Sequence, residues 1–155
     1  MKQAKQTGFT LIELIVVIVL LGILAATALP RFVNLGGDAR MAVMQGVAGS
    51  MQSANAQIYA TAVALGLQNL AASNLTAAQL GTTNAVAIAY GYASNATNLA
   101  NAMTLTPAAN FTVTAAAIQA AQAGTPANCQ VGYTAATSTT VPPVYTVTVS
   151  PNGCQ

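Results

Sequence analysis

Charged side chains are scarce in this chain of 155 residues, and their positions restrict the chemistry that it could carry out. Only 4% of the residues are charged, against about 25% in an ordinary soluble domain. The charged residues are Lys2, Lys5, Glu13, Arg31, Asp38 and Arg40. There is no histidine, and residues 41–155 contain no Asp, Glu, Lys or Arg.

This distribution argues against several classes of function. Acid–base catalysis would have no histidine and only two dissimilar carboxylates. A zinc or calcium centre would lack its cluster of ligands, and nucleic-acid binding would lack clustered Lys and Arg. The sequence therefore predicts a protein that is not an enzyme, needs no metal or other cofactor, and binds no nucleic acid.

Glu13 is the exception, because it lies inside an apolar segment. From Phe9 to Leu29 all residues except Glu13 are apolar, a glycine or a threonine. A helix over this stretch would be roughly 32 Å long, about the thickness of a bilayer core. A carboxylate there costs about 2.5–3.5 kcal/mol, so it needs a partner from a terminus, a lipid head group or another molecule. Glu13 therefore indicates assembly, although a carboxylate that reaches the membrane surface is an alternative.

The segment before the apolar run resembles no ordinary signal peptide, whose cleavage site follows its apolar stretch. Here the candidate junction, Gly8–Phe9, comes first, after the polar sequence MKQAKQTG. Lys2 and Lys5 favour a cytoplasmic N-terminus.

Residues 8–14, with the sequence GFTLIEL, closely resemble the start of the type IV pilins and their pseudopilin relatives. Gly22, Pro30 and the amphipathic stretch that follows extend this resemblance. Residues 30–40, PRFVNLGGDAR, are similar to the mannose-sensitive haemagglutinin subgroup of these pilins. The resemblance implies a structural subunit of a type IV pilus, which begins in the inner membrane and ends in an extracellular filament.

The resemblance also assigns roles to residues at the N-terminus. A prepilin peptidase would cut after Gly8 and methylate the new amino group of Phe9, and Glu13 would contact that amine on a neighbouring subunit. Elementary electrostatics agrees, since a carboxylate and an amine attract strongly in a medium of low dielectric constant. The implied partners are further copies in a helical homopolymer, the peptidase and the inner-membrane assembly machinery.

Gly22 and Pro30 are expected to weaken the helix that contains them. Glycine costs about 1 kcal/mol relative to alanine inside a helix, and proline about 3. The resemblance implies a helix that melts locally between these two positions in the filament. Helix defects that the membrane tolerates are an alternative explanation.

The fold class expected is α+β: a long N-terminal helix, half membrane-spanning and half amphipathic, packed on a small antiparallel sheet. We divide the chain into a leader at residues 1–8, a membrane and assembly helix at 9–30, and a pilin head at 31–155 whose helix covers 31–66. Apolar residues spaced by three or four predict that helix's buried stripe: Phe32, Leu35, Ala39, Val43, Val47, Met51, Ala54, Ile58, Ala62 and Leu65.

Shorter elements are expected beyond this helix. We predict a helical fragment around residues 76–80, a strand at 85–92 and a short helix at 95–103 that Asn95 caps. Residues 115–123 have high helix propensity, whereas the residues just before them favour a strand. Period-two alternation in residues 129–134 and 144–149 predicts an antiparallel hairpin.

The two cysteines are expected to form one disulfide in an oxidising compartment. The hairpin would bring Cys129 opposite Cys154, although two free buried thiols are an alternative. The resemblance implies that this disulfide closes a C-terminal loop on the outside of the filament.

Two classes of function therefore remain open. The first is a pilus subunit whose uncharged head supports adhesion or bundling, with a pseudopilin or minor pilin as a variant of it. The missing head carboxylates argue against the major pseudopilins of type II secretion, which carry a calcium site. The second is a monomeric, membrane-anchored binding domain in which Glu13 is incidental.

Overall fold

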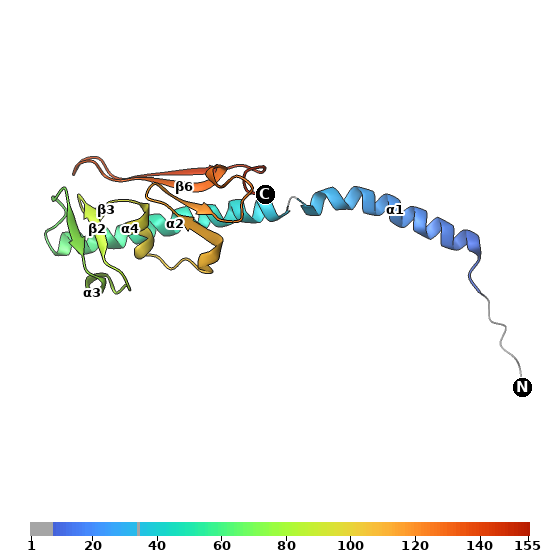
Figure 1. Cartoon of the computed structure of the whole chain (residues 1–155), viewed down its shortest axis with the longest axis horizontal. Helices are drawn as coiled ribbons and strands as arrows, with labels where there is room; N and C mark the ends of the chain where they lie inside the picture. Colours follow the sequence, from blue (N-terminus) through green and yellow to red (C-terminus); the bar gives the residue numbers. More distant parts are fainter. Residues whose placement is uncertain (1–7, 34) are drawn as a thin grey trace, which may run out of the picture. The chain divides into compact units, whose positions relative to one another are not determined.

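The computed structural model describes residues 8–33 and 35–155 (Figure 1). The chain forms two compact units that divide between Leu35 and Gly36. The first unit contains a single long helix, and the second contains a helix with two sheets. Residues 1–7 of the expected leader lie outside the described residues.

Helix α1 covers Leu11–Val33 and forms the first unit. Its stretch Leu11–Ala28 is long and apolar enough to cross a membrane. The helix continues without interruption through Gly22 and Pro30 in the single chain. Melting between these residues was expected in a filament, so it stays a prediction.

Helix α2 covers Leu35–Ala64 and supplies one wall of the head's core. The stripe expected from the sequence holds in its C-terminal part, where Val47, Met51, Ala54, Ile58 and Ala62 are buried. It fails at both ends, because Leu35, Val43 and Leu65 are exposed.

The reason for this failure is geometric. Repeated steps of four residues rotate about 40° past each full turn of an α-helix, so a stripe built from them drifts off the buried face. The face that is buried near the start of α2 instead contains Gly37, Met44 and Ala48.

Three short strands form the first sheet, in the order β1–β2–β3. They are β1 (Ser73–Leu75), β2 (Val86–Ala89) and β3 (Tyr92–Ala93), and both pairs are antiparallel. The strand expected at residues 85–92 is therefore a hairpin. Tyr90 and Gly91 both have positive φ, as in the two-residue turns that join twisted strands.

Two short helices flank this sheet where their capping residues predict them. Helix α3 (Ala77–Leu80) begins after Thr76, whose side chain accepts a hydrogen bond from the Gln79 N–H. Helix α4 (Ala96–Asn101) begins after Asn95, whose side chain accepts from the Asn98 N–H. Both caps satisfy N–H groups that a helix start leaves unpaired. Single 3-10 turns follow at η1 (Ala108–Asn110) and η2 (Pro126–Asn128).

Four antiparallel strands form the second sheet, in the order β4–β5–β6–β7. Their bounds are Phe111–Val113, Ala117–Ala120, Cys129–Thr134 and Val144–Val149. The expected hairpin is confirmed, since β6 and β7 pair along their whole length from Cys129↔Val149 to Thr134↔Val144. The ambiguous stretch at residues 115–123 forms β5, because pairing with both β4 and β6 outweighs its helix propensity.

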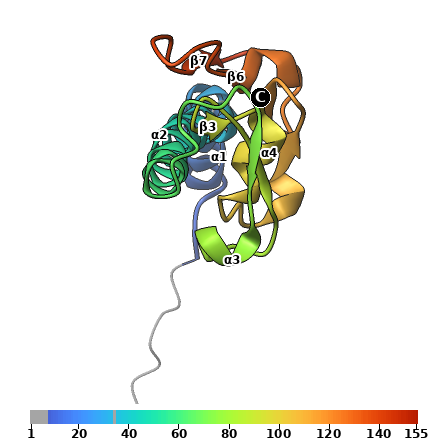
Figure 2. The ribbon, with the colours of Figure 1, turned by 90° about the vertical axis from the view of Figure 1, so that its left-hand side faces the viewer.

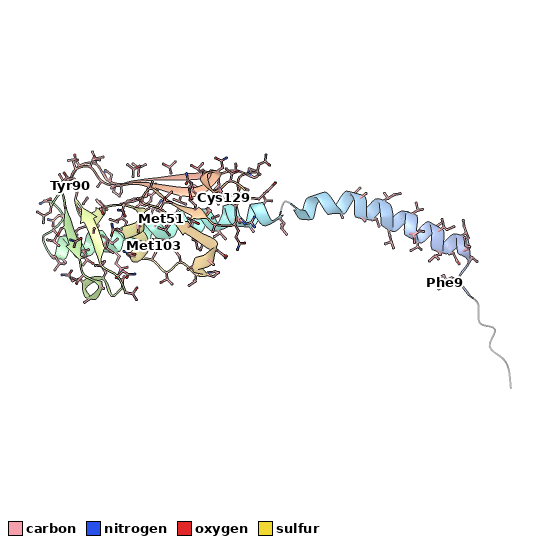
Figure 3. All side chains as sticks on the ribbon, in the orientation of Figure 1. Phe9, Met51, Tyr90, Met103 and Cys129 are labelled. Atoms are coloured by element: carbon pink, nitrogen blue, oxygen red, sulfur yellow. A yellow bond between two sulfur atoms is a disulfide. The ribbon has the colours of Figure 1, made fainter. Side chains whose placement is uncertain are left out.

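The head therefore has the expected α+β architecture, with two small sheets rather than one beside α2 (Figure 2). Its core combines residues from all three: Met51 and Ile58 of α2, Ile88 of the first sheet, and Ile118 and Val131 of the second. Met51 lies inside the head, whereas Phe9 lies just before the start of α1 (Figure 3).

Candidate functional site

The start of α1 brings the residues expected to act at the N-terminus onto one accessible segment. Gly8, Phe9 and Thr10 precede the helix and are exposed, and the Phe9 side chain is 94% exposed. The Gly8–Phe9 bond thus lies outside the helix and between exposed residues, which is where proteases cut most readily.

Thr10 and Glu13 cap the start of α1, because each accepts a hydrogen bond from the backbone N–H of the other. Glu13 Oε2 accepts hydrogen bonds from the Thr10 N–H at 2.9 Å and from the Thr10 hydroxyl at 2.7 Å. The Glu13 N–H donates in turn to Thr10 Oγ1 at 3.4 Å. This is a capping box, in which a threonine and a glutamate three residues later satisfy each other's backbone N–H groups. This role of Thr10 was not expected, although its T-x-x-E spacing with Glu13 is visible in the sequence.

Glu13 keeps capacity for a further partner. An ionised carboxylate offers about four acceptor positions, and the Thr10 contacts occupy two of them. Beside it lies a shallow hollow of about 330 Å³ lined by Phe9, Ile12, Val16 and Val17. A cation brought to Glu13 would therefore be surrounded by apolar groups.

From Leu11 to Ala28, helix α1 exposes a largely apolar surface on every side. Large side chains from Leu11 to Leu24 are exposed, and none of the segment Leu11–Ala28 is buried within the chain. An exposed apolar surface of this extent marks a membrane or protein contact. It needs lipid or other chains to cover it.

A buried polar network joins α2 to both sheets of the head, and it was not expected from the sequence. Asn55 is 1% exposed. Its Nδ2 donates to the Tyr133 hydroxyl at 2.9 Å and to the Tyr145 hydroxyl at 2.8 Å, while its Oδ1 accepts from the Ala93 N–H at 2.9 Å. The Tyr133 hydroxyl donates to the Ala93 carbonyl at 2.7 Å.

Each partner in this network belongs to a different element. Ala93 ends β3, Tyr133 lies on β6 and Tyr145 lies on β7. Burial raises the pKa of Tyr133 and of Tyr145, which keeps both hydroxyls protonated. A signal in the sequence could have revealed Asn55, since it falls between Met51 and Ile58 on the buried face of α2.

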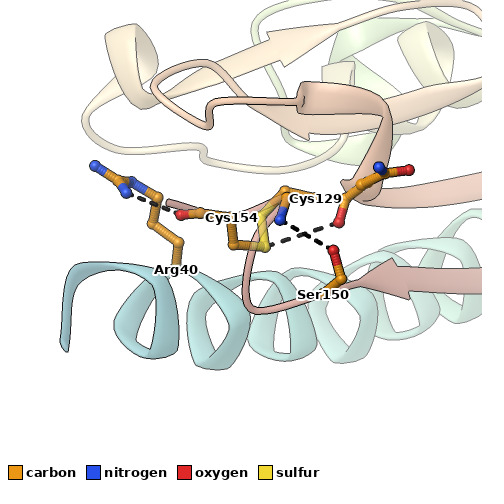
Figure 4. Close-up of a disulfide and its surroundings, with 6 residues drawn as sticks. Arg40, Cys129, Ser150 and Cys154 are labelled. Carbon is orange, nitrogen blue, oxygen red and sulfur yellow. Dashed lines mark hydrogen bonds between the residues drawn. A yellow bond between two sulfur atoms is a disulfide. The ribbon is translucent and has the colours of Figure 1, made fainter. Parts of the chain in front are cut away.

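The expected disulfide joins Cys129 and Cys154, with 5.0 Å between the Cα atoms. It closes a segment that contains the whole β6–β7 hairpin. Arg40 of α2 donates a hydrogen bond at 2.9 Å to the Cys154 carbonyl (Figure 4). Beyond residue 36 Arg40 is the only cation in the sequence, and it fastens the C-terminal segment to the start of α2.

Most of the tyrosines in the head make ring contacts. Tyr133 lies in the core and tilts against Tyr145, with ring centres 5.5 Å apart. Tyr59 stacks on Tyr92 at 4.6 Å. Among the described residues there is no group of three or more His, Cys, Asp or Glu that could hold a metal ion.

Comparison with known proteins identifies the N-terminal segment. Residues 3–29 match the family model of the prokaryotic N-terminal methylation motif. The chain is 50% identical over 52 residues to the type IV narrow pilus major component PilA5 of Thermus thermophilus, covering 34% of this chain and 45% of that protein.

Two further relatives match a similar share of the chain. One is the type II secretion system core protein G of Pseudomonas aeruginosa, 46% identical over 46 residues, or 30% of this chain and 32% of the relative. The other is the fimbrial protein EcpC of Eikenella corrodens, 41% identical over 59 residues, which cover 38% of this chain and 39% of that protein. The chain thus spans less than half the length of each relative, and no solved structure matches it significantly.

Proposed function

We propose that this chain, which belongs to the type IV pilin family in the broad sense that includes the pseudopilins, is a structural subunit of a type IV pilus. One observation carries the proposal. Glu13 is the only charged residue in the apolar stretch Leu11–Ala28 of α1, which is not buried within the chain, and it follows the Gly8–Phe9 junction of a methylation motif. Such a helix is suited to polymerisation, in which neighbouring helices would cover its surface.

Processing would create the partner that Glu13 lacks. A prepilin peptidase that cut after Gly8 would leave a charged and methylated amine on Phe9. In a filament, the amine of an incoming subunit would meet Glu13 of its neighbour inside a shell of apolar side chains. In low dielectric an ion pair with good geometry stabilises, whereas an unpaired carboxylate is strongly penalised.

The outward face of α2 supports close assembly of helices. Its exposed residues include Ala42, Gly46, Gly49, Ser53 and Ala56, which are small and uncharged. Small residues let helix backbones approach one another closely. Several turns of α2 could therefore accept the apolar side chains of neighbouring α1 helices.

The remaining parts of the proposal concern location and role. The precursor would sit in the inner membrane through α1, and assembly machinery there would deliver it to an extracellular filament. The head, which has no charged residue after Arg40, would support adhesion or bundling through polar contacts, as expected for a subunit of the mannose-sensitive haemagglutinin type. A pseudopilin is the second candidate, because one relative is a type II secretion protein.

Mass spectrometry and an isosteric variant test this function. In cells with a prepilin peptidase, the mature chain should lack residues 1–8 and carry one methyl group on Phe9. Glu13→Gln should keep the capping box, which accepts either residue, and should insert and be processed normally. Its incorporation into filaments should nevertheless fall by about tenfold or more, because the charge is gone. An uncut chain, or normal filaments from Glu13→Gln as sole subunit, would contradict the proposal.

A further inference from the structure

Strand β7 is the longest free edge among the described strands of the head. It is one margin of the sheet β4–β5–β6–β7 and contains six residues, Val144–Val149. The strands at the other margins of the two sheets are short: β4 and β1 have three residues each, and β3 has two. Figure 2 shows β7 at the outer border of the head. Short edges are one way in which proteins avoid pairing with other chains, and β7 departs from it.

The backbone of β7 presents an ordered row of free hydrogen-bonding groups. The Ser150 N–H donates to the Asn128 carbonyl, which places a hydrogen-bonded pair one step beyond Cys129↔Val149. Because such pairs alternate in antiparallel sheets, the N–H and C=O groups of Tyr145, Val147 and Val149 point away from β6. Within the part of the chain that the structure describes, none of these groups has a hydrogen-bond partner.

The usual protections against edge pairing are also missing from β7. Its sequence, VYTVTV, has no charge and no proline, and its register with β6 is unbroken over six pairs. Val144 is 54% exposed and Val147 is 42% exposed. Pro142 and Pro143 stop the edge just before β7 but leave the strand itself available.

We propose that β7 is a self-association edge, which pairs antiparallel with β7 of a second copy about a two-fold axis at Val147. This register places Val147 opposite Val147 and Tyr145 opposite Val149. It satisfies all the outward N–H and C=O groups of both strands at once. An aromatic side chain opposite a β-branched one is a favourable cross-strand pair, and no like charges oppose each other.

A single such contact is small, so two heads in dilute solution would associate only transiently, for long enough to be trapped by a crosslink but not to form a stable dimer. A filament would present the same edge on every subunit, so many weak contacts would act together. The expected consequence is the lateral bundling of filaments, a role that rests on the proposed function. Because β7 carries no charge, this contact should depend little on salt.

Cysteine crosslinking tests the pairing without requiring filaments. Opposite residues in a hydrogen-bonded antiparallel pair have Cα atoms about 5.5 Å apart, which suits a disulfide. In the detergent-solubilised full chain, Val147→Cys should form crosslinked dimers about tenfold faster than Val113→Cys. Val113 is the matched control, because it is 36% exposed on β4, at the opposite margin of the same sheet. Equal rates would overturn the proposal.

Paired charge variants test the bundling. Val147→Lys filaments and Val147→Glu filaments should each bundle about tenfold less than the parent, because like charges then face each other. Mixing the two should restore bundling, whereas Val113→Lys and Val113→Glu should change nothing alone or mixed. No rescue in the mixture, or equal rescue at position 113, would refute the β7 contact. A chain that crosslinks at Val147 but forms no filaments would refute the proposed function alone.

Discussion

Replacing Asn55 by alanine should cost the head a large part of its stability. The substitution leaves the Ala93 N–H buried without a partner, a loss of about 1–3 kcal/mol. It also removes the hydrogen bonds to the Tyr133 and Tyr145 hydroxyls, worth about 1 kcal/mol each. The expected loss is therefore about 3–5 kcal/mol, against a total of about 5–15 kcal/mol for an ordinary domain.

Chemical denaturation of the full chain in detergent can measure this loss. Every tyrosine lies between residues 59 and 145, so the tyrosine band of the near-ultraviolet circular dichroism spectrum reports on the head and has no contribution from α1. Ser53→Ala is the matched control, because Ser53 is exposed on the same helix. We expect its free energy of unfolding to change by less than about 0.5 kcal/mol.

A double-mutant cycle shows whether the loss comes from the network itself. Tyr133→Phe removes one partner of Asn55, so the two substitutions together should cost less than their sum by about 1–2 kcal/mol. Strict additivity would refute direct coupling through this hydrogen bond. A loss below about 1 kcal/mol for Asn55→Ala would refute the view that the network holds α2 to both sheets.

Two further predictions concern the head. In chemical denaturation, Gly91→Ala should lower the free energy of unfolding more than Gly66→Ala does. Both glycines have positive φ, so backbone strain is common to the two variants. Only at Gly91 would the added Cβ lie 2.9 Å from the Tyr59 ring. Equal losses would show that backbone strain alone matters. The free energy of unfolding should fall above about pH 10. Burial raises the pKa of Tyr133, Tyr145 and Tyr92 above that of an unfolded tyrosine. The stabilisation is therefore complete below about pH 10 and is lost as the pH rises through the pKa values of the folded state. Alkaline titration of parent and Tyr133→Phe chains should show a shallower fall in the variant, and identical profiles would contradict this assignment.

Local chemistry made much of the fold predictable from the sequence. Asn95 and Thr76 mark their helix starts because a single side chain satisfies a nearby N–H. The β6–β7 hairpin follows from strict alternation of side chains, and its closing disulfide from an isolated pair of cysteines.

Features that depend on distant partners were beyond the sequence. The stretch at residues 115–123 becomes a strand only because β4 and β6 lie on either side of part of it. The position of Asn55 between Met51 and Ile58 indicates burial, but the sequence does not show its hydrogen-bond partners, which lie 38 or more residues away. The cap that Thr10 forms with Glu13 is local, by contrast, and its T-x-x-E spacing is visible in the sequence.

The start of α2 lies next to the C-terminal segment at residues 151–155, and this has a mechanical consequence. A Cβ on Gly37 would lie 3.2 Å from the Pro151 carbonyl, and Arg40 holds the carbonyl of Cys154. Tension along the helices would thus pass through the backbone of α2. Both sheets would lie outside the path of that force, because the chain that forms them returns to the start of α2. In any assembly that grips the chain by its helices, the head would bear load without unfolding its strands.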